Sequence, residues 1–301
     1  MTAATTEEAP RIPIRHMNFQ FNAEQADPTF YLNAELASAY FEALSIFLTF
    51  GEDLVIETAR HHRDMLEDPY LKQRVTSLIG QEAIHSKVHE EWNDVLMEHR
   101  FPVNFYRFLA RNVFNHGFHR FPQPMKLSMM AGIEHFTAVL AEFMMKHEEY
   151  FFHSEDEKQR GLWMWHMLEE AEHKDIAYDV FQQLSGNYPL RISGFAVALV
   201  TIWFLVPLGG VLIPFIRRPR NLISRRFWKD AKRSFDLIAG RGDGVYGSTI
   251  GHVFDYLRPG FHPNDHDTSE YLAYYKERLL NPEDGLLVPY LSKEIIPRMR
   301  G

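Results

Sequence analysis

The sequence predicts an all-α protein: a four-helix bundle in which a longer connection crosses over between two helical hairpins. Apolar residues recur at helical spacing through the first 190 residues, and no segment there alternates as a strand would. Proline and capping signals divide this region into four long segments. A chain of 301 residues, 46% hydrophobic and 14% aromatic, can bury a large core as one domain or two.

The predicted elements begin after a polar, proline-interrupted stretch, residues 1–27, which we expect to be a loosely ordered arm. Its start lacks the basic and apolar regions of a signal peptide, so export is not expected. The bundle then occupies residues 28–190. From apolar periodicity and helix-breaking residues, its four helices are predicted at residues 29–67, 69–99, 124–152 and 155–184.

Local signals place the helix boundaries. Asp68-Pro69 separates the first helix from the second. Ser154 followed by Glu157 resembles a capping box at the start of the fourth. The aromatic segment 101–121 separates the second helix from the third, and it predicts a short helix within the crossover.

Composition limits the chemistry. The chain has no cysteine, which excludes disulfides, thiolate-bound metals and a cysteine nucleophile. Any metal must be held by carboxylate and imidazole, ligands that suit iron, manganese or zinc. Residues 191–301 carry 16 basic and 11 acidic residues, which leaves 16 of the 32 basic and 29 of the 40 acidic residues to residues 1–190. The acidic part argues against nucleic acid as a partner, and the basic part favours an anionic lipid surface.

Two Glu-x-x-His motifs occur on alternate helices of the predicted bundle. Glu82 and His85 lie on the second helix, and Glu170 and His173 lie on the fourth. Residues three apart project from the same helix face, so each pair can reach one centre. One such motif is weak, because surface helices are rich in both residues. Two on alternate helices indicate a shared site.

The first and third helices each carry a glutamate on an apolar stripe. Glu52 shares its face with Leu48 and Val55, and Glu134 shares its face with Met130. A carboxylate on a buried face is costly unless a cation compensates it. The resulting order, Glu, Glu-x-x-His, Glu, Glu-x-x-His, is the ligand arrangement of ferritin-like di-iron and di-manganese proteins.

The predicted ligands of two metal ions are Glu52, Glu82, His85, Glu134, Glu170 and His173. Glu169 is a further candidate, since it also lies one turn before His173. His89 and His166 are further candidates too, although they could be partners of the ligands or core histidines instead. Neighbouring acids are given supporting or structural roles: Asp175 and Asp179 could hydrogen-bond the histidines or lie on a solvated face, and Glu142 is expected to be structural or to support the ligands.

An apolar segment follows the bundle. Residues 192–216 contain no charge, and residues 217–233 carry eight Lys or Arg in 17 positions. The length suits a membrane span, although Pro207 and Pro214, with the glycines between them, are expected to break it. A single span would place the bundle outside the cell. A re-entrant or monotopic insertion of residues 191–233 from the cytoplasm, with the basic flank on anionic lipid, is therefore favoured. The alternative is an apolar fifth helix packed on the bundle.

Residues 234–301 form the predicted C-terminal extension, with glycine-rich turns and one helix near residues 268–280. Its loop RPGFHPNDHD, residues 258–267, contains His262 and other residues that could bind a metal. The favoured interpretation is a turn in which Asp267 or the next residue caps the following helix.

Five stretches in order resemble the bacterial family of predicted metal-dependent hydrolases: LTFGED, IGQEAIHSKVH, IEHFTAVLAE, WHMLEEAEHKDIAYDVF and RPGFHPNDHD. The resemblance covers about residues 15–280, and the family's pattern is similar to that of the ferritin-like di-iron superfamily. It implies the same six ligands, with His89 and His166 as further candidates. Thr49-Phe50 and Asn264 depart from residues that many members carry.

From these features we expect a non-haem di-iron enzyme that uses O2 to hydroxylate or desaturate a hydrophobic or lipid-like substrate. Manganese or a mixed pair could replace iron. A separate electron donor would be needed, because no flavin or nicotinamide fingerprint occurs. The alternatives are a metal-dependent hydrolase acting through metal-bound water, and a non-catalytic metal-binding protein at the membrane. We expect the cytoplasmic side of the inner membrane, or the cytoplasm, and a homodimer is compatible with the sequence.

Overall fold

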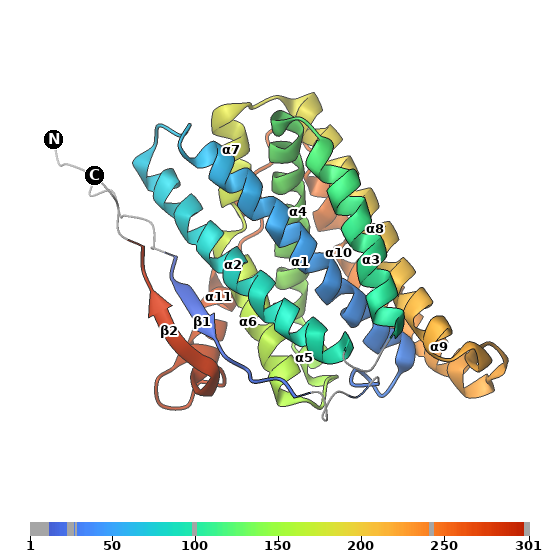
Figure 1. Cartoon of the computed structure of the whole chain (residues 1–301). Helices are drawn as coiled ribbons and strands as arrows, with labels where there is room; N and C mark the ends of the chain where they lie inside the picture. Colours follow the sequence, from blue (N-terminus) through green and yellow to red (C-terminus); the bar gives the residue numbers. More distant parts are fainter. Residues whose placement is uncertain (1–11, 23–26, 28, 98–100, 241–243, 298–301) are drawn as a thin grey trace.

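A computed structural model of the chain describes residues 12–22, 27, 29–97, 101–240 and 244–297. Long helices form nearly all of it, and the prediction of an all-α bundle is confirmed (Figure 1). Four helices form the bundle: α1 (Glu35–Arg63), α2 (Pro69–Met97), α4 (Gln123–Lys146) and α6 (Glu157–His173). The crossover between the hairpins contains α3 (Phe101–His116).

The fourth predicted helix is divided in two. α6 ends at His173, and α7 (Ile176–Leu184) continues after a turn at Lys174 and Asp175. Both side chains anchor this turn: Asp175 pairs with Arg74, and the Lys174 ammonium donates to backbone and hydroxyl oxygens of the C-terminal loop. The expected Ser154–Glu157 capping box is also absent. The Asp156 carboxylate instead accepts from the backbone N–H groups of residues 158 and 159, at 2.8 and 3.1 Å.

The third predicted helix also ends early. α4 stops at Lys146, His147 leaves the helical conformation, and the short α5 (Glu149–Phe152) follows. The elements that follow the bundle in the chain are α8 (Tyr188–Arg217), α9 (Arg225–Ala239), α10 (Val245–Asp255), α11 (Ser269–Leu280) and β2 (Leu291–Ile295). Neither α10 nor β2 was anticipated in the sequence.

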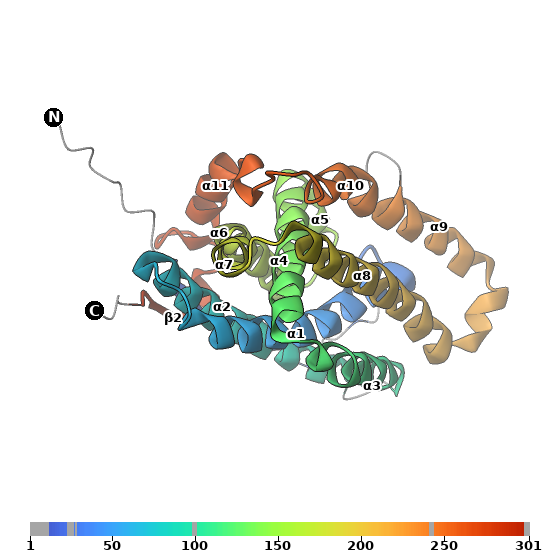
Figure 2. The ribbon, with the colours of Figure 1, turned by 90° about the horizontal axis from the view of Figure 1, so that it is seen from above.

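α8 is one continuous helix, so the break expected at its prolines is wrong. Each proline removes only one backbone donor, and packing against α1, α3 and α4 holds the helix together. Gly194 permits the close approach to α4, since a Cβ there would lie 2.6 Å from the backbone carbon of Ser128. Among the described residues α8 alone is long and apolar enough to cross a membrane, but it packs along the bundle as a fifth helix (Figure 2).

Part of the expected polar arm is ordered. Residues 14–17 form β1 (Ile14–Met17), which pairs antiparallel with β2 and lies against α2 (Figure 1). Gly80 of α2 makes room for this strand, because a Cβ there would lie 2.2 Å from Cδ1 of Ile14. The strand buries Arg15 beside the fourth helix of the bundle.

Candidate metal centre

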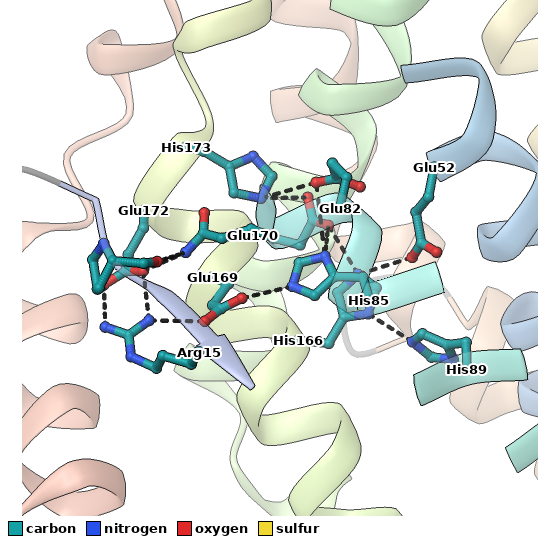
Figure 3. Close-up of polar contacts among 12 residues, drawn as sticks. Arg15, Glu52, Glu82, His85, His89, His166, Glu169, Glu170, Glu172 and His173 are labelled. Carbon is teal, nitrogen blue, oxygen red and sulfur yellow. Dashed lines mark hydrogen bonds and ion pairs between the residues drawn. The ribbon is translucent and has the colours of Figure 1, made fainter. Parts of the chain in front are cut away.

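The two Glu-x-x-His motifs meet in the middle of the bundle (Figure 3). Oε1 of Glu82 lies 3.2 Å from Nε2 of His173 and 3.7 Å from Nδ1 of His85. Oε1 of Glu170 also lies 3.7 Å from Nδ1 of His85. All four side chains are at most 2% exposed. Spacing of three residues on α2 and α6 therefore aims two carboxylates and two imidazoles at one buried point.

The single glutamates of α1 and α4 lie at the edge of this group. Oε1 of Glu52 is 3.8 Å from Nε2 of His166, and these two residues form a second group of possible ligands with His85. Glu134 is placed differently. Its Oε2 lies 2.9 Å from Nδ1 of His173, whereas the other ring nitrogen of His173 faces Glu82. Glu134 therefore contacts the central group only through His173, on the side of the ring that faces away from Glu82.

Six buried ligand atoms of this centre have no hydrogen-bond partner among the described residues. They are Oε1 and Oε2 of Glu52, Oε1 of Glu82, Nδ1 of His85, Oε2 of Glu170 and Nε2 of His173. Leaving one charged group buried and unpaired costs several kcal/mol, and native proteins avoid it. Carboxylate oxygens and imidazole nitrogens that face one another without hydrogen bonds fit divalent metal ions. The residues present thus suit the metals that the sequence pattern predicts.

Glu169 lies behind His85 rather than in the central group. Its Oε2 is 3.0 Å from Nε2 of His85, and its Oε1 accepts from Arg15 at 2.9 Å. When Nε2–H donates to Glu169, Nδ1 of His85 keeps its lone pair and faces the centre. Carboxylates commonly fix metal-binding histidines in this way.

A hydrogen-bonded chain likewise orients His166. The Ser45 hydroxyl donates to Oδ1 of Asn93, so it accepts from Nδ1–H of His89, at 2.8 Å in both cases. Nε2 of His89 can then accept from Nδ1–H of His166, 2.6 Å away. This leaves Nε2 of His166 unprotonated, 2.8 Å from Oε1 of Glu170. His89 therefore supports His166 and does not itself face the centre.

The charges of the centre are unbalanced without cations. Burial, with the negative charge of Glu82, raises the pKa of Glu134 to about 8, and the same causes raise the pKa of Glu52. Burial alone would lower the pKa of His173, but Glu170 and Glu134 raise it to about 10. Burial and like charge thus favour the neutral forms of Glu52 and Glu134, in positions where metal ions would supply positive charge.

Other acids near the motifs have partners elsewhere. Glu172 binds Arg15 and Lys276 at 2.8 and 2.9 Å. The proposed hydrogen bonds from Asp175 and Asp179 to the motif histidines are not formed. Asp175 pairs with Arg74, and Asp179 accepts from the loop residue His262 at 2.9 Å.

The loop RPGFHPNDHD forms the turn that was favoured, but Thr268, the N-cap residue of α11, makes no side-chain cap hydrogen bond. Nδ1 of His262 accepts from the N–H of Asn264, and Asp267 accepts from the N–H of Ser269 at 2.9 Å, immediately before α11. Glu142 forms a further cluster with His252 and His266. Lys146 binds its carboxylate, so the charge of this cluster is compensated by the protein itself.

Several residues of the centre were missed in the sequence. Arg15, Ser45 and Asn93 orient the histidine partners, but each is a common residue type without a motif. Arg15 lies 154 residues from Glu169 along the chain, and the two meet because β1 packs on the bundle against α2. Alternation in the segment IRHM, with Arg15 and Met17 inward, is the one available signal, and four residues are too few to identify it.

Fold and site together define a metal-binding helical bundle with a buried carboxylate and histidine centre. The chain belongs to the family described as "predicted metal-dependent hydrolase", whose pattern matches residues 13–267. This confirms the resemblance found in the sequence. Comparison with curated proteins and with solved structures gave no match. Metal dependence is thereby supported, whereas the expected oxidation of a lipid has no support from the comparisons, and the hydrolase alternative fits the family better.

Proposed function

We propose that this protein is a metal-dependent hydrolase with a dinuclear centre between α2 and α6, flanked by α1 and α4. The observation that carries the proposal is the convergence of six buried ligand atoms, from both Glu-x-x-His motifs and Glu52, that lack a hydrogen-bond partner in the described part of the chain. The family description supports hydrolysis as the reaction class. Two divalent ions would be held by Glu52, Glu82, His85, Glu170 and His173, with His166 beside Glu52 and Glu134 behind His173.

When bound, the ions would supply Lewis acidity and an activated water for attack on an ester or phosphate. The residues of the chain prepare the site for them. Glu169, itself held by Arg15, directs the single proton of a neutral His85 ring to Nε2, so that Nδ1 can bind a metal ion. In the same way, His89 and Ser45 direct the proton of His166 to Nδ1 and leave its Nε2 available. Burial removes competing water from the carboxylates, which strengthens their attraction for a cation.

Metal analysis on purified protein tests the centre. We expect about two divalent ions per chain, by plasma mass spectrometry, and a loss of at least one ion in both Glu82→Gln and Glu170→Gln. Glu91→Gln is the matched control, since Glu91 lies on the same helix as Glu82 but is 43% exposed. A folded parent protein that takes up no divalent metal on reconstitution would contradict the proposal.

A reaction screen then tests hydrolysis. Protein reconstituted with manganese or zinc is assayed under argon against a panel of carboxylic and phosphoric esters. We expect turnover that needs metal but not oxygen and that is lost in Glu82→Gln. Metal-loaded protein without hydrolytic activity on any class would remove the hydrolase assignment and leave the centre intact.

A second candidate function is oxidation with O2, favoured by one observation. The donor set of two Glu-x-x-His motifs and two further glutamates on four helices is typical of carboxylate proteins that bind iron or manganese. This candidate requires a separate electron donor and suits a hydrophobic substrate. Oxygen consumption by the ferrous protein, absent with zinc, would support it over hydrolysis.

A further inference from the structure

A hollow of about 940 Å³ lies between α1, α8, α9 and α10, away from the metal centre. Aromatic and aliphatic side chains line most of it, among them Tyr40, Trp203, Trp228 and Phe235. Lys232 supplies a cation to its lining. Figure 2 shows α9 and α10 returning beside α8 after the turn that follows α8.

Exposed apolar side chains extend beyond this hollow along α8, α9 and α10. We define the apolar face as Val200, Phe204, Trp228, Phe235, Ile250 and Phe254. The exposed fractions of Phe204, Trp228 and Phe235 are 63%, 52% and 65%. Soluble proteins rarely expose so many large apolar residues together without a partner.

Basic residues adjoin the apolar face. α9 carries Arg225, Arg226, Lys229, Lys232 and Arg233, all exposed, against two aspartates. At 100° per residue, Trp228, Ala231 and Phe235 share one side of α9, and the five cations share the neighbouring side with Asp236. Asp230 and Asp236 pair with Arg226 and Lys232, which leaves a net positive charge on that side. A helix with an aromatic side and a Lys/Arg side is suited to the interface of an anionic membrane.

We propose that the apolar face and the cations of α9 dock on the surface of an anionic lipid bilayer. The aromatic side chains would enter the acyl boundary while the cations contact lipid phosphates. α8 would lie along the membrane and not across it, because it packs against α1 and α4. A second copy of the chain fits less well, since a two-fold interface would place the cations of α9 near those of its partner. The apolar face extends beyond the hollow, because three of its exposed members, Val200, Phe204 and Phe254, do not line it. One lipid molecule bound in the hollow would therefore not cover the whole face.

The docking surface is distinct from the metal centre. Tyr40 lines the hollow and Glu52 lies 12 residues further along the same helix, a separation of about 18 Å at 1.5 Å per residue. The inference does not rest on the proposed reaction. It assigns the protein a place at the membrane, where an amphiphilic substrate would be concentrated.

Vesicle co-sedimentation of the full chain tests this inference. One vesicle contains phosphatidylcholine alone, and the other adds about a third of phosphatidylglycerol. We expect binding to the anionic vesicle, weakened by salt, and quenching of tryptophan emission by lipids brominated near the headgroup end of the acyl chain. The double variant Trp228→Glu/Phe235→Glu and the double variant Arg225→Glu/Lys229→Glu should each weaken binding at least about tenfold.

Met65→Glu is the matched control, because Met65 is 54% exposed but lies in the turn after α1, at the end of that helix remote from the hollow. Its vesicle binding should equal that of the parent. Circular dichroism and metal content are measured for every variant. If both are unchanged, weaker vesicle binding reflects loss of docking and not loss of the fold or of the metal centre. Absence of binding to anionic vesicles, or equal binding by all variants, would overturn the inference. A dimer in the parent that the Trp228→Glu/Phe235→Glu variant lacks would overturn it in favour of a second copy.

Discussion

At the scale of single residues, the centre depends on side chains that hold the histidines. Glu169 occupies both of its oxygens, one with His85 and the other with Arg15. Arg15 in turn binds Glu172, so its charge is shared by two buried carboxylates. The guanidinium of Arg15 thus keeps the Glu169 carboxylate behind His85, as the acceptor for its Nε2–H, and away from the point where the ligand atoms meet.

Glu169→Gln should therefore weaken metal binding while leaving every proposed ligand in place. Glutamine has the same size but is a weaker acceptor, and removal of such partners typically costs 10–100-fold in metal affinity. The dissociation constant, measured by competition with a chromophoric chelator, reports the effect. Glu294→Gln is the control, since Glu294 also contacts Arg15, at 3.2 Å, but is 44% exposed. Equal affinities in the two variants would show that Glu169 does not orient His85.

At the scale of elements, α8 is fixed to the bundle by small residues. The hydroxyl of Ser128 on α4 donates to the carbonyl of Leu190, at 2.6 Å, where α8 begins. Gly194 lies against the same serine. The helices approach closely at this point because neither contributes a bulky side chain.

Gly194→Ala should lower the free energy of unfolding by about 1–3 kcal/mol, the usual range for overpacking a tight contact. The added methyl would lie 2.1 Å from the Ser128 hydroxyl and 2.6 Å from backbone, so α8 must shift. Gly251→Ala on α10 is the matched control. Apart from its own helix backbone and chain neighbours, no atom of the described residues lies within 4 Å of a Cβ there, and alanine should leave stability unchanged or raise it by up to about 1 kcal/mol. Urea titration measures both, and equal loss in the two variants would contradict the packing argument.

The features that could be predicted from the sequence are those that depend on residues close together in the chain. Features that depend on contacts between distant segments were missed. The Glu-x-x-His motifs and the apolar stripes are local, and helical spacing alone places Glu82 beside His85 and Glu170 beside His173. The break in the fourth helix was missed because the contacts of Asp175 and Lys174 are made to distant segments. The continuous α8 was missed for the related reason that packing outweighs its internal prolines.

At the scale of the whole molecule, the centre concentrates negative charge where four helices meet. Glu52 shows the cost most clearly, since it is 3% exposed and both of its oxygens lack a hydrogen-bond partner among the described residues. A fold that keeps such a group gives up stability in the metal-free state in return for affinity toward cations. Metal binding should therefore contribute to folding as well as to chemistry.

Removal of metal should lower the melting temperature of the parent by about 6 °C. At a free metal concentration of about 1,000 times Kd, binding stabilises the native state by about 4 kcal/mol. With an unfolding entropy of about 2.1 cal/mol/K per residue, each kcal/mol corresponds to about 1.6 °C for 301 residues. Differential scanning calorimetry with and without chelator measures the difference.

Glu52→Gln tests the origin of that difference. Without metal, the neutral amide relieves the repulsion from Glu82 and lowers the cost of burial, which are the causes that raise the pKa of Glu52. The metal-free variant should therefore melt at or above the metal-free parent, while added metal should stabilise it much less. If the metal-free variant melts well below the metal-free parent, Glu52 stabilises the bundle itself. Its position on the apolar stripe would then need no cation to explain it.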